Sequence, residues 1–224
     1  MKIFLQALAS SVFGVAFFAV LLFVPAGTLN YWQAWVFIAV FMLATLIPSL
    51  YLAVRNPAAL RRRMKAGPGA ETRTSQKLII SGIIAAVVAV LVVSALDHRF
   101  GWSQVPTTLV VAGDILVAAG LVAAQWVVIE NSYAAATITV ETGQTVVTTG
   151  LYGIVRHPMY AGTLVMMLGT PLALDSYWAL FAVLVALPLL AARILDEESV
   201  LRQQLAGYPE YMDKVRYRLV PFLW

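Results

Sequence analysis

A series of long apolar segments, each close to the length that crosses a lipid bilayer, constrains this fold more than any other feature. Residues 3–24 form an almost uninterrupted apolar run after Lys2, and further runs cover 31–54, 78–96 and 107–129. A membrane-spanning helix needs about 20 such residues. Because backbone groups in lipid must be hydrogen-bonded internally, these runs predict α-helices. The first run is longer than the roughly 7 to 15 apolar residues of a signal-peptide core, which favours a retained membrane helix.

Two shorter apolar segments follow near the C-terminus, at 159–173 and 177–195. Pro158 supplies a helix-compatible start for the first of them, and their tight connection predicts an antiparallel pair. The composition, with 61% hydrophobic and 12% charged residues and a mean hydropathy of +0.85, leaves too little polar surface for a water-soluble globule. The sequence therefore predicts an all-α integral membrane protein with about six transmembrane helices.

The distribution of basic residues predicts the orientation of these helices. Segment 55–77 is strongly basic, and Glu71 is its single acid. If the helices alternate in direction, Arg99 alone among the 15 Lys and Arg residues falls on the opposite side from all the others. By the positive-inside rule, both termini and the 55–77 loop are cytoplasmic. We interpret the loop as an orientation signal that also touches anionic membrane lipids rather than as a site for an acidic substrate.

Several classes of function are disfavoured by composition. The chain has no cysteine and only two histidines, so a thiolate or zinc site is not expected and we predict no metal. The net charge of +4 follows the membrane topology, and basic residues are not interleaved with aromatics on a soluble face, so we predict no nucleic-acid partner. Membrane lipids are the expected surroundings.

The chain divides into two regions. Residues 1–129 contain four predicted transmembrane helices and the basic loop 55–77. Residues 130–224 contain two transmembrane helices and a tail with tyrosines, prolines and basic residues, expected to lie on the membrane surface. Between the regions, residues 137–148 alternate with period two, which predicts a small hairpin or an extended flap. This flap is expected to cap a cytoplasmic pocket formed by the C-terminal half.

Two isolated ionisable residues are expected to have a packing role rather than a catalytic one. Asp114 lies two turns into its predicted helix, near the non-cytoplasmic surface and remote from the basic cluster at Arg156. An ionisable group inside a membrane helix is costly and often functional, but this position favours a packing or interfacial role. The same interpretation holds for His98.

The best candidate site joins two polar clusters that follow one another along the C-terminal half. Arg156 and His157 precede Pro158 at a helix start, where free backbone donors suit an anion; the alternative is that they anchor the helix at the headgroups. Arg193 and Glu197 share a helical face, and the alternative there is a simple intrahelical ion pair. Three consecutive acids, residues 196–198, carry more negative charge than packing needs, and the surplus favours a cationic ligand.

These residues carry a family resemblance. The ordered pattern resembles the isoprenylcysteine carboxyl methyltransferase family over residues 130–221, and similar motifs occur in a wider group that includes phospholipid N-methyltransferases. It consists of residues 144–150, Tyr152, residues 156–160, Arg193, Glu197, Glu198, Leu201, Tyr208 and Tyr211.

The resemblance implies an integral membrane methyltransferase that uses S-adenosyl-L-methionine without a nucleotide-binding domain of its own. It implies that Arg193 contacts the substrate as the catalytic residue, with Arg156 and Glu198 in support. It implies that the cofactor contacts are Gln144, Thr145, Val146, Val147, Tyr152, His157, Pro158, Met159, Tyr160 and Glu197.

The sequence leaves open the chemical class of the group that accepts the methyl. A carboxylate needs no general base, and a lipophilic or prenylated carboxylate that reaches the site from the bilayer is the favoured substrate, with Arg193 holding the carboxylate. A phospholipid or small-amine acceptor would need a general base and less help from Arg193. A non-enzymatic membrane binding protein is the third alternative, although the predicted spans carry few polar residues apart from Asp114 and Gln125.

Overall fold

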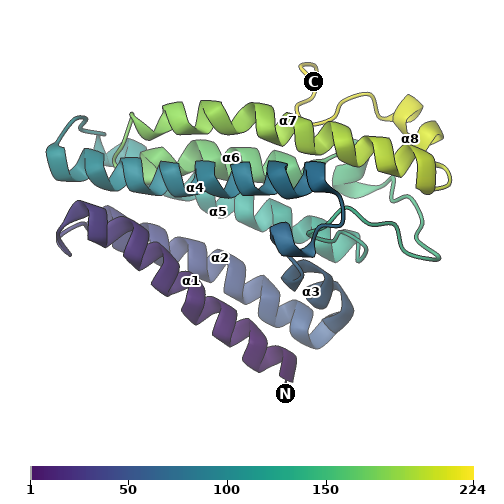
Figure 1. The fold of residues 1–224 in the computed structure, drawn as a ribbon, viewed down its shortest axis with the longest axis horizontal. Helices are drawn as coiled ribbons and strands as arrows, with labels where there is room; N and C mark the ends of the chain where they lie inside the picture. Colours follow the sequence, from purple (N-terminus) through teal and green to yellow (C-terminus); the bar gives the residue numbers. More distant parts are fainter. Residues whose placement is uncertain (1) are drawn as a thin grey trace.

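The computed structural model describes residues 2–224, which form a bundle of helices (Figure 1). The long helices are α1 (Lys2–Ala26), α2 (Trp32–Arg55), α4 (Thr74–Phe100), α5 (Thr107–Glu130), α6 (Pro158–Ala173) and α7 (Ala179–Gln204). The short ones are α3 (Pro57–Met64), α8 (Tyr208–Lys214) and the single turns η1 (Pro68–Ala70) and η2 (Gly150–Gly153).

Five of the helices described, α1, α2, α4, α5 and α7, are long and apolar enough to cross a membrane. Helix α6, with 16 residues, is the sixth apolar helix. At 1.5 Å per residue it extends about 24 Å, which is short of the roughly 30 Å hydrocarbon layer. The prediction of an all-α integral membrane protein is confirmed, and five of the about six predicted transmembrane helices are long and apolar enough to span among the described residues. Helices α4 and α7 extend several residues beyond their predicted bounds at the end that carries α3 and α8.

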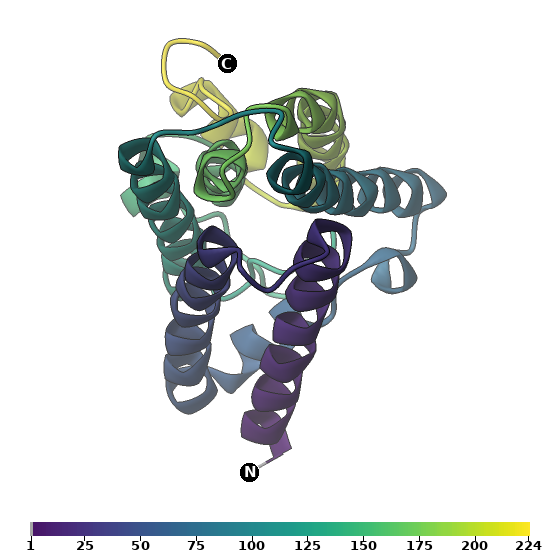
Figure 2. The same cartoon turned by 90° about the vertical axis from the view of Figure 1, so that its left-hand side faces the viewer.

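Helices α1 and α2 lie together beside a layer made of α4, α5, α6 and α7, and the view along the bundle shows this separation (Figure 2). Aromatic side chains pack where the two groups meet. Phe18 and Phe37 are buried with their rings 5.5 Å apart, and Leu22 is fully covered beside them. This ring contact joins α1 to α2, and the same buried cluster continues to Leu91 of α4 and Val117 of α5, which holds the N-terminal pair on the layer that carries the site.

Glycines allow α5 and α6 to cross at backbone contact distance. A Cβ atom added at Gly120 would lie 2.4 Å from the carbonyl oxygen of Gly162, and one at Gly113 would lie 2.4 Å from the amide nitrogen of Ala173. Asp114, next to Gly113, is buried and its Oδ1 has no hydrogen-bond partner among the residues described. The crossing fixes the start of α6, and therefore Pro158, against the end of α5.

The end of the bundle remote from α3 and α8 is closed by a buried polar network. The Asp97 carboxylate accepts hydrogen bonds from the hydroxyls of Ser103 at 2.5 Å and Ser176 at 2.6 Å. The His98 ring stacks on Tyr31 with centroids 3.9 Å apart. These contacts join three loops, which agrees with the predicted packing role of His98.

The basic loop folds into a short helix. Asn56 caps α3 by accepting a hydrogen bond from the amide of Ala59 at 3.2 Å, and Pro57 occupies the first helical position. Asn and Pro at these two positions are typical of a helix start. The result places consecutive arginines of the basic segment beside residues 131–149.

Residues 131–149 contain no strand in the structure, so of the two predicted alternatives the extended flap is found and the hairpin is not. A turn occurs where Gly143 has φ +80°, and the amide of Gln144 donates to the Glu141 carbonyl at 3.1 Å. The two limbs flank a pocket instead of pairing with each other.

The C-terminal tail packs back onto the start of α6. The amides of Arg156 and His157 donate to the carbonyls of Tyr217 and Arg218, each at 2.9 Å. The backbone of the tail thus pairs with the segment before Pro158, and its position on the membrane surface stays a prediction.

Candidate functional site

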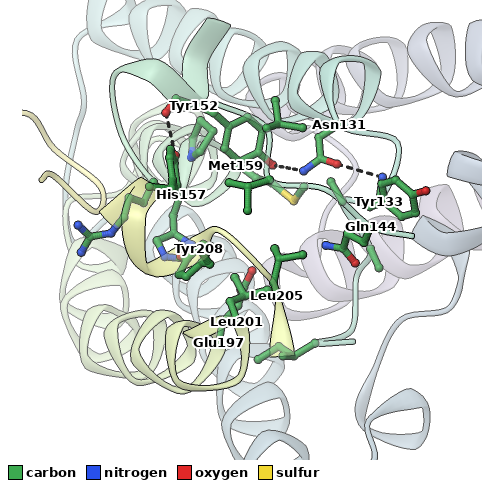
Figure 3. Close-up of a pocket in the computed structure, with 18 of the residues that line it drawn as sticks. Asn131, Tyr133, Gln144, Tyr152, His157, Met159, Glu197, Leu201, Leu205 and Tyr208 are labelled. Atoms are coloured by element: carbon green, nitrogen blue, oxygen red, sulfur yellow. Dashed lines mark hydrogen bonds between the residues drawn. The ribbon is translucent and has the colours of Figure 1, made fainter. Parts of the chain in front are cut away.

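A pocket lies between the flap, the start of α6 and the end of α7 (Figure 3). Every residue that the resemblance assigns to the cofactor lines it, which brings together side chains separated by more than 50 positions. These are Gln144, Thr145, Val146, Val147, Tyr152, His157, Pro158, Met159, Tyr160 and Glu197. Arg156 also lines the pocket, whereas Arg193 and Glu198 lie behind it.

The pocket also includes residues that the sequence did not single out. Asn131, directly after α5, donates from Nδ2 to the Tyr152 hydroxyl at 3.0 Å and accepts from the Tyr133 amide at 3.1 Å. The sequence feature that could have identified Asn131 is its position directly after the predicted helix, as the first polar amide of the flap. The other additional lining residues are Tyr133, Ala134, Ala135, Thr137, Ile138, Thr139 and Leu205, and the pocket is completed by Leu201, Tyr208 and Tyr211, which belong to the pattern of the resemblance but had no assigned contact.

The three consecutive acids point to three different partners. Asp196 forms an ion pair with Arg73 at 2.9 Å and accepts a short hydrogen bond from Gln76. Glu198 is buried among basic side chains. Glu197 lines the pocket and accepts from the Tyr160 hydroxyl at 2.7 Å. The surplus charge inferred from the sequence therefore reduces to one carboxylate, Glu197, that faces the pocket.

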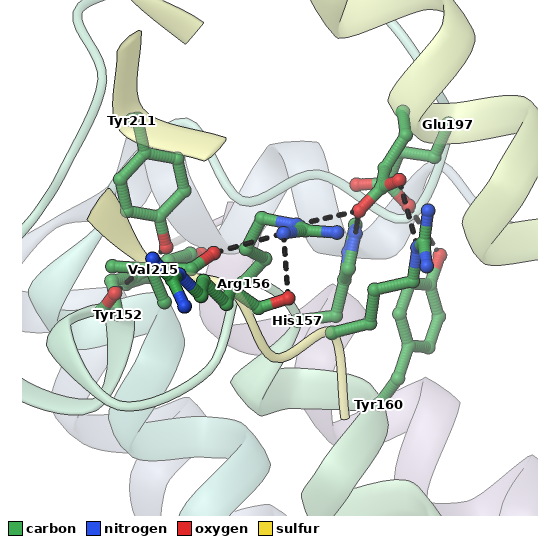
Figure 4. A network of polar contacts seen from close by, with 10 residues as sticks. Tyr152, Arg156, His157, Tyr160, Glu197, Tyr211 and Val215 are labelled. Atoms are coloured by element: carbon green, nitrogen blue, oxygen red, sulfur yellow. Dashed lines mark hydrogen bonds and ion pairs between the residues drawn. The ribbon is translucent and has the colours of Figure 1, made fainter. Parts of the chain in front are cut away.

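Arg156 and His157 are anchors of the fold rather than an open anion site (Figure 4). Arg156 donates from Nε to Glu198 at 2.7 Å and from Nη1 to the carbonyls of Val215 and Arg216, each at 2.9 Å. Because the backbone amides of Arg156 and His157 are also bonded to the tail, the donors expected to be free are occupied. An anion at this helix start would therefore not be bound by these two amides, and the predicted anion site stays a prediction.

Arg193 does not form the intrahelical ion pair considered as an alternative. Arg193 is 2% exposed, and its guanidinium pairs with Glu71, at 2.8 Å between Nη2 and Oε1. It also donates from Nε to the Tyr160 hydroxyl at 3.3 Å, so Tyr160 connects Arg193 to Glu197.

Neutral phenols surround the Glu197 side of the pocket. Burial raises the pKa of Tyr152 to about 12, and burial likewise raises the pKa of Tyr208 and Tyr211 above the usual range. The Tyr211 hydroxyl donates to the Tyr152 carbonyl at 2.7 Å. The Tyr208 hydroxyl is buried and has no hydrogen-bond partner among the described residues. A buried polar atom without a partner in a pocket wall fits a bound ligand.

Two arginines of α3 hold the flap over the pocket. Arg62 makes a bidentate contact with Glu141, both distances 2.7 Å, and donates to the Ser132 carbonyl at 3.3 Å. Arg63 donates to the Ala135 carbonyl at 3.1 Å and contacts the Met159 sulfur at 3.2 Å. The basic loop thus has a structural role at the pocket that its charge pattern alone did not indicate.

Most of the part of the chain that forms the pocket matches a known protein family. A family described as phospholipid methyltransferase matches residues 108–206, from α5 through the flap and α6 to the last residues before α8. This part of the chain is similar to the phospholipid methyltransferase family. The match contains Tyr160 and Glu197 together with the whole flap. It confirms the resemblance at the level of the wider group.

A curated protein also matches part of the chain. Delta(14)-sterol reductase TM7SF2 of Mus musculus is 35% identical over 91 residues, which cover 39% of this chain and 22% of that protein. The chain thus spans about a fifth of the length of this relative. Its name describes a reductase that acts on a sterol.

Proposed function

We propose that this protein is an integral membrane methyltransferase that uses S-adenosyl-L-methionine and acts on a lipophilic acceptor. The observation that carries the proposal is the pocket-facing carboxylate of Glu197 among neutral tyrosines, within the region that matches the methyltransferase family. A sulfonium is a cation, and a carboxylate with aromatic faces is the chemistry that binds one. When bound, this cofactor supplies an activated methyl group.

The side chains that line the pocket are of the chemical types needed to bind each part of the cofactor. Glu197 would hold its positive end, and the unpartnered hydroxyl of Tyr208 would donate to or accept from a polar group of the ligand. The apolar side chains of Val146, Leu201 and Leu205 suit an adenine ring. The flap, held by Arg62 and Glu141, would exclude water that competes with the acceptor.

We propose a carboxylate as the acceptor group and Arg193 as its contact. Arg193 is the buried arginine adjoining Tyr160, and it already holds a carboxylate, that of Glu71. A carboxylate nucleophile needs no base, so alignment and desolvation are the main requirements. The acceptor chain would approach from the bilayer, since α7 is long and apolar enough to span it and its end forms part of the pocket.

An amine acceptor is the second candidate, because the matched family is described as phospholipid methyltransferase. An amine must be neutral to attack, and it would need a base near the pocket. A reduction like that named for the sterol reductase relative is a third candidate and would need a bound reductant. These candidates differ in the ligand that the pocket takes.

Calorimetric titration of the purified protein in nonionic detergent tests the proposal. We expect S-adenosylhomocysteine to bind and a reduced nicotinamide dinucleotide not to bind. The Glu197→Gln and Tyr160→Phe variants should bind S-adenosylhomocysteine more weakly, whereas Glu210→Gln, an exposed acid on α8, should bind it like wild type. Binding of the nicotinamide alone would overturn the proposal in favour of the reductase alternative.

A further inference from the structure

The guanidinium of Arg193 already contacts four groups of the protein itself. It donates to Gln76 Oε1 through a short Nη1 contact, to the Ala136 carbonyl at 3.0 Å, and to Tyr160 at 3.3 Å. The remaining contact is charged: Nη2 lies 2.8 Å from Oε1 of Glu71. Both side chains of this ion pair are 3% exposed.

Glu71 comes from a segment that otherwise faces outward. Residues 65–73 connect α3 to α4, and Glu71 is the buried side chain among exposed and half-buried neighbours. It is also the single acid of the basic stretch 55–77. Gly67 in this segment has φ +92°, and a Cβ added at Gly67 or Gly69 would meet nothing within 4 Å. The segment is therefore attached to α7 through Glu71 and through the ion pair of Arg73 with Asp196, with open space around its glycines.

The ion pair between Arg193 and Glu71 determines which acceptor head groups can bind to Arg193. Removing one partner of a buried ion pair leaves an uncompensated charge, whereas replacing one carboxylate by another keeps the arginine paired. A carboxylate can therefore take the place of Glu71 without leaving Arg193 unpaired, and the released Glu71 can be solvated because its neighbours are already exposed. A cationic amine cannot make this exchange.

We propose that Glu71 is the specificity-determining residue of the acceptor site: its carboxylate occupies the acceptor position on Arg193, and an acceptor carboxylate binds by displacing it. This inference rests on the proposed function for the identity of the reaction. The Tyr160 hydroxyl contacts both Arg193 and Glu197, so the exchange takes place one side chain away from the cofactor pocket. The exchange thereby selects acceptors with a carboxylate over neutral and cationic lipids, because only a carboxylate can replace Glu71 on Arg193.

The test compares octanoate with octylamine, which share a chain and differ in the charge of the head group. Each is titrated into wild type, Glu71→Gln and the exposed-acid control Glu210→Gln, all saturated with S-adenosylhomocysteine. We expect octanoate to bind Glu71→Gln about tenfold or more tightly than wild type, because an internal competitor is removed. Octylamine affinity and S-adenosylhomocysteine affinity should stay within twofold. Unchanged or weaker octanoate binding by Glu71→Gln would overturn the proposal and leave Glu71 as a structural counter-ion.

A second measurement uses the wild-type protein, in case Glu71→Gln does not fold. Hydrogen exchange of residues 65–73 should become faster with octanoate and stay unchanged with octylamine; equal exchange in both cases contradicts the displacement. If S-adenosylhomocysteine does not bind at all, the proposed function fails. The octanoate comparison then still decides the role of Glu71 in the protein without nucleotide.

Discussion

The carboxylate of Glu198 lies 2.7 Å from Nε of Arg156, and their side chains are 4% and 5% exposed. The other oxygen of Glu198 accepts from Arg218 Nε at 2.9 Å, and His157 Nε2 lies 3.3 Å from the first. One side chain of α7 thus joins the segment before α6 to the C-terminal tail. These contacts position Pro158 and Tyr160 relative to Glu197.

Replacing Glu198 by alanine should destabilise the fold strongly. The change leaves Arg156 buried without its carboxylate, and breaking a buried pair from one side costs about 3–5 kcal/mol. Thermal unfolding in detergent, followed by tryptophan fluorescence, measures the loss. Glu210→Ala, which removes an exposed acid from α8, is the matched control and should unfold like wild type. Equal stability of the two variants would show that Glu198 does not hold the three segments together.

The crossing of α5 and α6 should not tolerate a methyl group. In Gly120→Ala the new Cβ would lie 2.4 Å from the Gly162 carbonyl oxygen, so one helix must shift. Overpacking of this kind costs about 1–3 kcal/mol, and here the obstacle is backbone. We expect a lower melting temperature and weaker binding of S-adenosylhomocysteine, because α6 carries Tyr160. Gly69→Ala, with nothing within 4 Å of its added Cβ, should match wild type.

The contact between Arg62 and Glu141 should make closure of the flap depend on pH. The hydrogen bond from Arg62 holds the pKa of Glu141 below its ordinary value of 4.5. Because the folded-state pKa is lowered, the stabilisation is present above pH 4.5 and is lost as the pH falls through the lowered value. Arg62 stays charged throughout this range. Acidification should therefore release the flap.

Protection factors from hydrogen exchange of residues 133–140 measure this release. Glu141→Gln at pH 7 should lower them about two- to fivefold, as for an exposed ion pair, and should remove their dependence on pH. Glu210→Gln should keep the wild-type profile. A wild-type profile in Glu141→Gln would mean that the carbonyl contacts of Arg62 and Arg63 hold the flap alone.

Much of the fold followed from local patterns. Apolar length predicted the membrane helices, and Pro158 marked the first residue of α6. The flap shows what the periodicity of a sequence cannot predict. Alternation over 137–148 indicated that side chains of this segment are covered on one side. The pocket, and not a partner strand, lies on that side. The residues that the resemblance assigns to the cofactor line one pocket because they lie in the flap, at the start of α6 and near the end of α7.

The environment of Arg193 could not be predicted in the same way. Glu71 is more than 100 positions earlier, and its pairing depends on how α4 packs on α7. The available signal was a single acid within a basic stretch, which is unusual for a segment that only sets orientation. Similarly, the tail's carbonyls satisfy the amides of Arg156 and His157, and no local rule identifies such distant partners.

The orientation in the membrane stays a prediction and can be tested with single cysteines, because the chain has none of its own. Ala66, near α3, and Gln104, between α4 and α5, are exposed at opposite ends of α4. Cysteines at the two positions should differ in their reaction with an impermeant maleimide in sealed vesicles. The residue-66 variant should react only from the cytoplasmic side. Equal labelling of both would exclude the predicted arrangement of helices.

The substitution Arg193→Lys separates a substrate contact from a purely structural role. Lysine keeps the positive charge and can pair with Glu71, but a single ammonium cannot also reach Gln76, the Ala136 carbonyl and Tyr160 in their present geometry. If the planar guanidinium aligns the acceptor carboxylate, methyl transfer to octanoate should fall by about 30- to 1000-fold, corresponding to about 2–4 kcal/mol of transition-state stabilisation.

Binding of S-adenosylhomocysteine by Arg193→Lys should fall less than transfer does, because Glu197 and the tyrosines remain in the pocket wall. A purely structural arginine would affect both measurements together, through the Tyr160 hydroxyl that it shares with Glu197. Arg202→Lys, an exposed position near the end of α7, is the matched control and should retain both activities. Wild-type transfer by Arg193→Lys would remove Arg193 from the acceptor site and favour an amine acceptor.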